Sequence, residues 1–485
     1  MLGLDVFKEL EEIDRWMDAH EAEFVNDISS LVRIPSVSVT GSGPYIYGKA
    51  CKDAADRMIE IAEGYGFKTE DCGGRCVKVS YGEYADGKPD VEIWGHLDVV
   101  PEGDGWKYPP YECTRIGDYL IGRGIGDNKG PLMIVLYSMR WLKEHGVNLT
   151  YNLSQLCGLA EETGMEDASW YLRQYRAPDF AFISDCRFPL CHGEKGRCTM
   201  TFISDGVLND LLELEAGIVV NSVAETATAL LKGNHEINTG ITEFYPIISD
   251  AVYAETEYTC GNTKVTVHGI AGHAAAPEKC INPVGILAGL LNRCNSLSAR
   301  TRTFMAFLES SCRDGYGTGL GIACEDPVFD RMTCAGTLLR LDDGGIRLSF
   351  DMRYPPSLPI GEIVNAADQE ARRFGFHLES SHHRDGYYQD PKTPQIQALI
   401  KAYETVRKDG AKPYVMGGNT YAGLFPHAVA FGPAIPSDYS ALKLPPGHGG
   451  GHACDEVQLL SSFRQAIKIY ILALQNLSEV MQPRI

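Results

Sequence analysis

The sequence lacks an excess of positive charge. Its 485 residues include 44 Lys and Arg against 64 Asp and Glu, which gives a formal net charge of -20 at pH 7. A protein with this net negative charge repels phosphate backbones and anionic lipids, because binding to them depends on Lys and Arg. We therefore expect neither a nucleic acid nor a membrane among its partners.

Long hydrophobic runs and paired cysteine motifs are also missing. No stretch approaches about 18 consecutive apolar residues, so no transmembrane helix is expected. Residues 1–16 do not show the cationic and apolar segments of a signal peptide. The 15 cysteines are scattered without CxxC spacing. We therefore expect reduced thiols in a cytoplasmic protein.

Helical periodicity and short apolar runs alternate at both ends of the chain. Helices are expected at 1–16, 24–32, 49–64, 132–142, 167–175, 398–408 and 457–477, and strands at 77–81, 91–94, 151–159, 180–184 and 428–431. The strands 77–81 and 91–94 are expected to be neighbours, because a turn-rich segment joins them. This alternation is typical of an α/β fold with a mostly parallel sheet and helices on both faces.

The pattern changes in the middle of the chain. Strand-like runs at 198–203, 264–268, 336–341 and 345–351 are interleaved with helices expected at 224–231 and 283–297. Such a mixture is typical of a separate open α+β domain. The sequence therefore predicts a discontinuous catalytic domain, residues 1–186 and 385–485, into which an α+β domain, residues 187–384, is inserted.

The first candidate site residues are His96 and Asp98, which follow the apolar run that begins at Val91. Residues i and i+2 of an extended strand share a face, so Asp98 can orient a His96 whose other ring nitrogen binds a ligand. A core strand that ends in a polar turn would give the same local pattern. This stretch alone leaves both interpretations open.

Four further stretches place acidic residues or a histidine after a strand or in a glycine-rich loop. They are Asp127 in the loop 124–131, Glu161 and Glu162 after the strand 151–159, Asp185 after the strand 180–184, and His452 in the loop 447–452. Each also has an ordinary structural explanation, such as a helix N-cap, a helix-dipole partner, a turn or a surface position. Ligands of open α/β sheets bind beyond the carboxyl ends of the strands, where these side chains could converge. Together they form a mixed nitrogen and oxygen set suited to two zinc-like ions that share a carboxylate.

In this order the motifs resemble those of the co-catalytic metallopeptidases, a family that includes aminoacylases, carboxypeptidase G-like enzymes and succinyl-diaminopimelate desuccinylase. The chain looks most similar to the PepV-type bacterial dipeptidases, from near its N-terminus to its last helix. The resemblance implies a zinc-peptidase-like catalytic domain with an inserted α+β lid domain. It also implies two divalent metal ions as cofactors, with zinc expected and manganese or cobalt as alternatives.

The same resemblance implies the metal ligands. One ion would bind His96, Asp127 and Asp185, and the other would bind Asp127, Glu162 and His452, so that Asp127 bridges the two. His448 is a rival of His452 for the ligand role. Only His452 is followed four positions later by an acidic residue, Glu456, as in the family pattern.

Two residues of the catalytic domain would act on these ligands and on the substrate. Asp98 would orient His96, and Glu161 would be the general base that activates a metal-bound water and passes its proton to the leaving amine. Asn128 stands where many family members carry a second Asp, a departure that we expect to matter little for metal binding.

Residues of the inserted domain are implied to bind the substrate. His273, with Asn221, would stabilise the oxyanion. Arg353 has a planar fork suited to a free carboxylate; an ion pair with the nearby Asp351 is the alternative, which the resemblance makes the weaker one. Gly418 is also expected to contact the substrate. Relatives often extend the run Gly417, Gly418 by one more glycine, whereas Asn419 follows it here.

These expectations predict a metallo-dipeptidase, an exopeptidase that hydrolyses the peptide bond of dipeptides. An N-acyl-amino-acid amidase of the desuccinylase kind would use the same site. A non-catalytic metal-binding or peptide-binding protein would keep the fold, but it would not need the base Glu161. The inserted stretch of about 200 residues could hold two similar halves. We therefore expect a monomer in which His273 serves the metal centre of its own chain.

Overall fold

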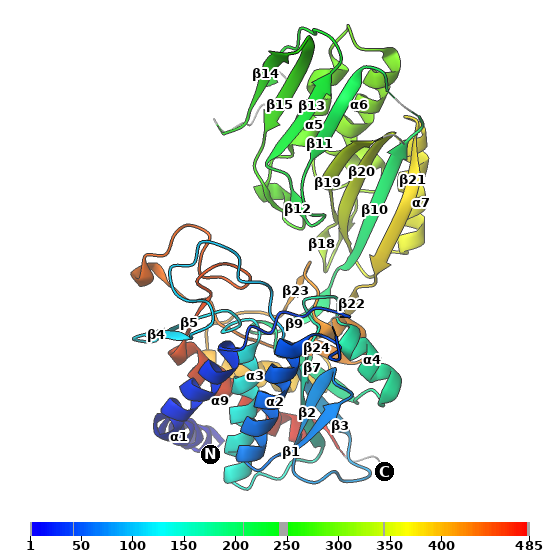
Figure 1. The fold of residues 1–485 in the computed structure, drawn as a ribbon. Coiled ribbons are helices and arrows are strands. Elements are labelled where there is room, and N and C mark those ends of the chain that lie inside the picture. The colour runs from blue at the N-terminus through cyan, green and yellow to red at the C-terminus, as the bar shows by residue number, and fades with distance from the viewer. Residues whose placement is uncertain (1, 42, 207, 242–250, 343–344, 483–485) are drawn as a thin grey trace. The chain divides into compact units, whose positions relative to one another are not determined.

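The computed structural model describes residues 2–41, 43–206, 208–241, 251–342 and 345–482. The chain divides into two compact units (Figure 1). Unit 1 comprises Met1–Gly193, Gln389–Tyr414 and Asn419–Ile485, and unit 2 comprises Glu194–Tyr388 and Val415–Gly418. The predicted inserted domain, 187–384, lies in unit 2 apart from residues 187–193. The sequence did not indicate that the short segment Val415–Gly418 groups with unit 2.

The helices of unit 1 are α1 (Leu2–Val32), α2 (Lys49–Gly64), α3 (Lys129–Glu144), α4 (Glu166–Gln174), α8 (Pro394–Arg407) and α9 (Leu460–Val480), with short 3-10 turns η4 (Tyr421–Leu424) and η5 (Ser440–Leu442). The prediction of separate helices at 1–16 and 24–32 is wrong, because α1 is continuous. Residues 17–23 contain no Gly or Pro and are rich in Ala and Glu, so nothing in them stops a helix.

The main sheet of unit 1 has the strand order β1-β2-β6-β3-β7-β24-β9-β22, with β23 pairing with β9. Its strands are β1 (Lys68–Cys72), β2 (Cys76–Tyr81), β3 (Asp90–His96), β6 (Asn152–Gly158), β7 (Phe180–Ile183), β9 (Cys191–Glu194), β22 (Tyr387–Tyr388), β23 (Tyr414–Met416) and β24 (Ala428–Ala430). Shorter pairings join β4 (Thr114–Ile116), β5 (Tyr119–Ile121) and β26 (Val457–Leu459), and join β8 (Cys186–Arg187) with β25 (Pro433–Ala434).

The sheet is mixed, with its parallel pairs in the centre. The pairs β6–β3, β3–β7 and β7–β24 are parallel, whereas β1–β2, β2–β6 and β24–β9 are antiparallel. The predicted adjacency of the strands 77–81 and 91–94 is wrong, because β6 lies between β2 and β3. The connection 82–90 is long enough to cross one intervening strand, a distance of about 10 Å.

Helices cover both faces of this sheet, which confirms the predicted α/β class. On one face α1, α2, α3, α8 and α9 share a hydrophobic core with Ile93 of β3. On the other face the next residue, Trp94, packs edge-on against Tyr171 of α4 and Tyr421 of η4. This alternation follows from the two-residue repeat of a strand.

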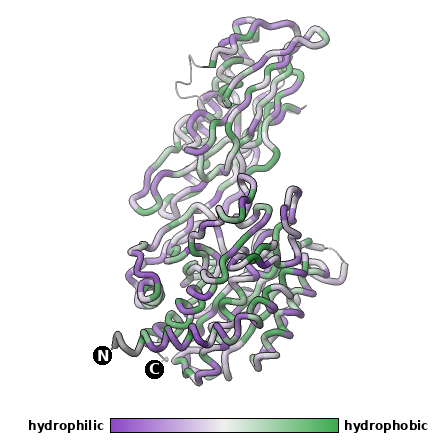
Figure 2. Tube along the Cα trace, turned by 90° about the vertical axis from the view of Figure 1, so that its left-hand side faces the viewer, coloured by the Kyte–Doolittle hydropathy of each residue, from purple (hydrophilic) through white to green (hydrophobic). Residues whose placement is uncertain are grey.

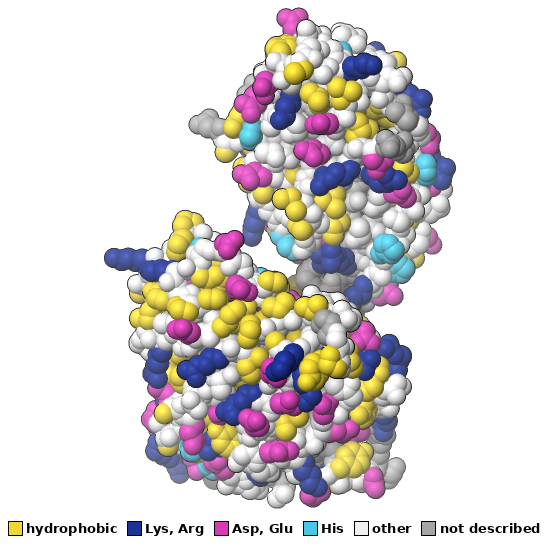
Figure 3. Space-filling model, in the orientation of Figure 1, with side chains coloured by type: hydrophobic (Ala, Val, Ile, Leu, Met, Phe, Trp, Pro, Cys, Tyr) yellow, Lys and Arg dark blue, Asp and Glu magenta, His cyan; other side chains and the backbone are white. Residues whose placement is uncertain are grey.

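The surface carries both signs of charge. Lys and Arg side chains stand among Asp and Glu on the visible face of each unit (Figure 3). Hydrophobic and hydrophilic stretches alternate along the tube in Figure 2. Among the described residues, every helix is too short or too polar to cross a bilayer.

Unit 2 contains an antiparallel sheet with the strand order β14-β15-β13-β11-β19-β20-β10-β21. Its strands are β10 (Gly196–Ser204), β11 (Leu211–Ala216), β13 (Thr226–Leu231), β14 (Tyr253–Thr259), β15 (Asn262–His268), β19 (Thr333–Asp342), β20 (Gly345–Tyr354) and β21 (Phe376–Arg384). The remaining elements are the strands β12 (Ser222–Val223), β16 (Gly272–His273), β17 (Glu325–Asp326) and β18 (Asp330–Arg331), the helices α5 (Pro283–Asn292), α6 (Ala299–Ser311) and α7 (Ile360–Arg372), and the 3-10 turns η2 (Pro277–Lys279) and η3 (Thr318–Leu320).

The prediction of a helix at 224–231 is wrong, because most of this segment forms strand β13. Ala227, Ala229 and Leu231 are buried, while the residues between them are at least partly exposed. This is the two-residue repeat of a strand, and threonines at 226 and 228 favour extended backbone. This repeat decides against a helix.

Candidate metal centre

The candidate site of unit 1 lies where three neighbouring parallel strands end. His96 is the last residue of β3, Glu161 and Glu162 follow β6, and Asp185 follows β7. The other two residues come from loops, Asp127 from the segment before α3 and His452 from the segment before β26. Because the carboxyl ends of parallel strands meet at one edge of a sheet, residues far apart in the sequence come together there.

Asp127 faces a histidine with each of its carboxylate oxygens. Its Oδ1 lies 3.0 Å from Nε2 of His96, and its Oδ2 lies 3.1 Å from Nε2 of His452. Asp185 Oδ2 lies 3.5 Å from Nε2 of His96, and Glu162 Oε1 lies 2.9 Å from Nε2 of His452. The structure therefore forms two groups of potential ligands that share Asp127, each with its ligand atoms within 4.8 Å of one another.

The chemistry of these groups fits divalent metal ions. Each group offers one imidazole nitrogen and carboxylate oxygens, a donor set that zinc accepts. Hydrogen bonds to Asp127 and Glu162 raise the pKa of His452 to about 10. Burial lowers the pKa of His96, but its bonds to Asp127 and Asp185 outweigh this and raise it well above its usual value. The negative charge of the carboxylates that raise these two pKa values would also attract metal cations.

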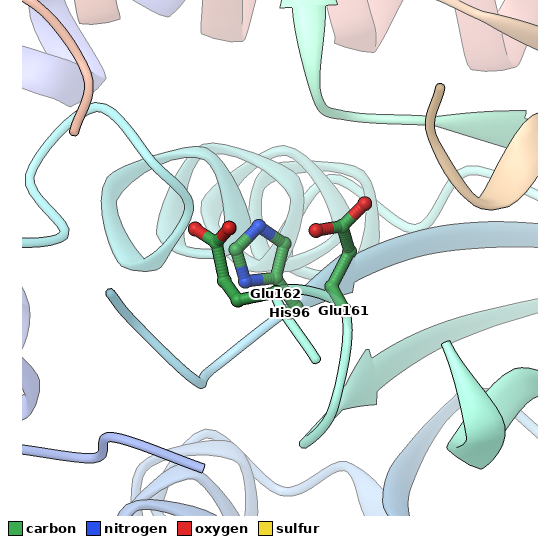
Figure 4. Close-up of side chains that lie close together, drawn as sticks. All are labelled: His96, Glu161 and Glu162. Carbon is green, nitrogen blue, oxygen red and sulfur yellow. The ribbon is translucent and has the colours of Figure 1, made fainter. Parts of the chain in front are cut away.

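Glu161 and Glu162 lie on different sides of the His96 ring (Figure 4). The two glutamates also form a third group with His96, within the same 4.8 Å limit. Burial raises the pKa of Glu161 well above its usual range, and the negative charges of Asp185 and Glu162 add to this effect. A carboxylate of raised pKa is a stronger base, which suits Glu161 for proton transfer.

Asp98 fixes both His96 and the segment that carries the two glutamates. Nδ1 of His96 lies 2.9 Å from the backbone oxygen of Asp98 and 3.4 Å from its carboxylate. A carbonyl oxygen only accepts, so Nδ1 donates to Asp98 O, and Nε2 is the ring nitrogen that faces Asp127 and Asp185. The carboxylate also accepts from the backbone N–H groups of Glu161 and Glu162, both at 3.1 Å.

Glu456 holds the loop that presents Asp127. Its Oε1 accepts from the backbone N–H groups of Gly126 at 2.7 Å and Asp127 at 2.9 Å. Its Oε2 accepts from Gly124 N–H at 3.1 Å and from Arg123 Nη1 at 2.9 Å. The spacing after His452 marked Glu456 in the sequence, but only the structure shows that it joins the two loops of the site.

Asn128 and Asp167 are supporting residues whose roles the sequence did not reveal. Nδ2 of Asn128 donates to Ser184 O at 2.7 Å and to Asp185 Oδ1 at 3.1 Å. Asn128 thus positions one of the potential ligands, Asp185. The buried carboxylate of Asp167 accepts from the backbone N–H groups of residues 159 and 160, just before Glu161, at 2.7 and 2.9 Å.

His448 has a different environment from its rival His452. Its Nδ1 lies 2.6 Å from Oδ2 of Asp455, a buried carboxylate that also accepts from the backbone N–H groups of Lys107 and Tyr108. Among the described residues, His448 belongs to none of the potential ligand groups. The geometry therefore favours a structural role for this histidine.

The candidate substrate-binding residues of unit 2 lie close together. Asn221 O accepts from Ala274 N–H, and Ser222 pairs with His273. Arg353 forms the ion pair that was the alternative to substrate binding, with Nε 2.7 Å from Asp351 Oδ1. Its Nη1 donates to Gly417 O at 2.9 Å, beside the predicted Gly418. If Gly417 carried a Cβ atom, this atom would lie 3.7 Å from Cβ of Ala275. The segment with Gly417 and Gly418 is therefore next to the His273 loop.

Comparisons with known proteins identify relatives over most of the chain. Residues 93–476 match the family model described as Peptidase family M20/M25/M40. The chain is 27% identical over 470 residues to a "Putative dipeptidase" of Staphylococcus aureus (strain MW2), covering 94% of this chain and 97% of the relative. A relative of the same name in Staphylococcus haemolyticus (strain JCSC1435) is 27% identical over 425 residues, 85% of this chain and 90% of the relative.

Solved structures show the same fold at low sequence identity. Human carnosine dipeptidase 1 matches with a TM-score of 0.57 and 15% identity, over 97% of this chain and 99% of the other. The dipeptidase Dug1p of Saccharomyces cerevisiae also has a TM-score of 0.57, with 16% identity over 97% of this chain and 98% of the other.

The two histidines of the 447–452 loop give a direct test of the ligand groups. We expect His452→Ala to lose one of two bound metal ions and most activity, because its Nε2 faces both Asp127 and Glu162. The matched variant His448→Ala should keep both ions. Elemental analysis of the purified proteins, together with an activity assay, measures this difference. Equal metal loss in both variants would overturn the assignment.

Proposed function

The chain belongs to the peptidase family M20/M25/M40, and from this premise we propose that it is a metallo-dipeptidase with two divalent metal ions. The observation that carries the proposal is the pair of ligand groups that share Asp127. His96 and Asp185 complete one group, and Glu162 and His452 complete the other. The relatives named as dipeptidases in staphylococci favour dipeptides over acylated amino acids as substrates.

The residues around the proposed ions have separate tasks. When bound, two such ions supply Lewis-acid chemistry, which polarises a carbonyl group and lowers the pKa of water; zinc is expected, with manganese or cobalt as alternatives. Glu161 takes a proton from the attacking water and delivers it to the leaving amine. Asp98 keeps the proton of His96 on Nδ1, so that Nε2 stays available as a ligand.

We propose that the residues gathered in unit 2 bind the substrate. His273 and Asn221 stabilise the oxyanion that forms on the scissile carbonyl, and Arg353 and Gly418 hold the substrate's carboxylate. Two facts support this proposal: the backbone of Asn221 is bonded to the His273 loop, and Arg353 is fixed beside Gly417.

A panel of substrates tests the proposed function. Metal-loaded enzyme should hydrolyse dipeptides with free termini faster than N-acetyl and N-succinyl amino acids of matched side chain, and it should lose activity on treatment with a chelator. Measurement of kcat/KM for each compound gives the comparison. Faster hydrolysis of the acylated compounds would instead favour the amidase function, which uses the same metal chemistry.

The adjacent glutamates provide a matched pair of variants. Glu161→Gln keeps the shape of the side chain but removes the base, so both ions should remain bound while kcat falls by roughly 100-fold or more. Glu162→Gln should instead lose one ion. If Glu161→Gln lost metal and Glu162→Gln kept it, the roles of these two residues would have to be exchanged.

We further propose that one chain supplies the whole site and that the enzyme works as a monomer. Inactive Glu161→Gln protein mixed with inactive His273→Ala protein should then recover no activity, because neither chain can supply what the other lacks. Activity of the mixture and its mass in solution, from light scattering, provide the test. Recovered activity with a stable dimer would show that His273 acts across subunits.

A further inference from the structure

A buried carboxylate in unit 2 is shared by two arginines. Asp351 has no solvent exposure, and its Oδ1 accepts from Nε of Arg353 at 2.7 Å. Its Oδ2 accepts from Nη2 of Arg353 at 3.3 Å and from Nε of Arg197 at 3.0 Å. A forked contact with Arg353 alone would already compensate this carboxylate. Arg197 therefore adds a second positive charge next to a carboxylate that Arg353 already neutralises.

The arginines stand side by side on neighbouring strands. Arg197 of β10 lies directly opposite Arg353 of β20, and on its other side it lies opposite Arg384 of β21. Like charges at directly opposite positions of antiparallel strands destabilise a sheet. Arg197 and Arg353 share only Asp351 as a carboxylate partner among the described residues, so this pair keeps one uncompensated positive charge. That charge is unusual in a chain of net charge -20.

The two guanidinium groups differ in their free donors. Arg353 is almost completely buried, and three of its N–H groups are bound, two to Asp351 and one to Gly417 O. Arg197 has 37% side-chain exposure and uses only Nε. Both terminal amino groups of Arg197 are without a partner among the described residues. They present four N–H donors in a plane, which is the geometry that binds a carboxylate.

Arg197 also lies near the candidate oxyanion residue. Burial lowers the pKa of His273, and the positive charges of Arg353 and Arg197 lower it further, against the opposing effect of Asp351. The geometry agrees: Arg353 donates to Gly417 O, a Cβ on Gly417 would lie 3.7 Å from Ala275 of the His273 loop, and Arg197 shares Asp351 with Arg353. This places Arg197 in the same cluster of unit 2 as the proposed substrate-binding residues, although no motif in the sequence marks it.

We propose that Arg197 binds a second carboxylate of the substrate, so that the enzyme prefers dipeptides whose C-terminal residue is Asp or Glu. This inference rests on the proposed dipeptidase function and names its substrate class. Arg353, with its remaining donors, holds the α-carboxylate, and Arg197 holds the side-chain carboxylate. Opposite residues on neighbouring strands have Cβ atoms about 5 Å apart, a spacing suited to two carboxylates on one amino acid.

Two isosteric dipeptides test this preference, Ala-Glu and Ala-Gln. Wild-type enzyme should show a KM at least about tenfold lower for Ala-Glu, because a hydrogen bond between charged groups is lost with Ala-Gln. In Arg197→Gln the KM ratio should fall to near one, while the metal content stays unchanged. The inference is overturned if wild type shows no preference, or if Arg197→Gln raises both KM values equally.

A matched control separates this effect from a general loss of positive charge. Arg347 lies on β20 as well, but six residues before Arg353, and it pairs with Asp342 and Glu379. Arg347→Gln should therefore keep the full preference for Ala-Glu. Equal loss of the preference in Arg347→Gln and Arg197→Gln would overturn the specific role of Arg197.

A binding experiment distinguishes failure of this inference from failure of the proposed function. If wild type hydrolyses neither dipeptide, the dipeptidase function is wrong, and calorimetry with L-glutamate and L-glutamine then tests the carboxylate site directly. Metal-loaded wild type should bind L-glutamate at least about tenfold more tightly than L-glutamine, and Arg197→Gln should not. Equal affinities in wild type would overturn the inference.

Discussion

The dominant constraint in unit 1 is the crowding of negative charge at one edge of its sheet. The three overlapping groups of potential ligands around His96 and His452 contain four carboxylates, those of Asp127, Glu161, Glu162 and Asp185. A fifth carboxylate, that of Asp98, lies next to His96. Like charges this close cannot all stay ionised without compensation, and burial makes the repulsion stronger. Divalent cations bound by the two ligand groups would relieve this repulsion. The arrangement of the carboxylates, rather than any single residue, therefore indicates a metal-dependent function.

The backbone around the site is held in place by further buried carboxylates. Glu456 accepts three N–H groups of the glycine loop, Asp167 accepts two before Glu161, and Asp98 accepts those of both glutamates. Hydrogen bonds from N–H groups stabilise these buried negative charges, and Arg123 adds an ion pair to Glu456. The loops that carry the ligands are consequently fixed by short contacts of 2.7 to 3.1 Å.

In unit 2 the cluster of Arg197, Arg353 and Asp351 carries a net positive charge, in contrast to the negative charge of the site in unit 1. One buried carboxylate, Asp351, orients two guanidinium groups, and a positive charge is left over near His273. The proposed binding of carboxylates in unit 2 would need such local positive charge, because the chain as a whole repels anions. Negative charge in unit 1 suits cations, and positive charge in unit 2 suits the carboxylates of a peptide.

The sequence by itself determined the α/β class and the residue types of the candidate metal site, because these depend on local patterns. A strand that ends in His96 or Asp185 can be recognised from a few neighbouring residues, and parallel strand ends converge in every such sheet. Only the tertiary structure decided that 226–231 forms a strand, that β6 separates β2 from β3, and that Arg197 stands opposite Arg353. These features depend on which distant segments pair and on how charge is compensated across them, and no single stretch of sequence contains that information.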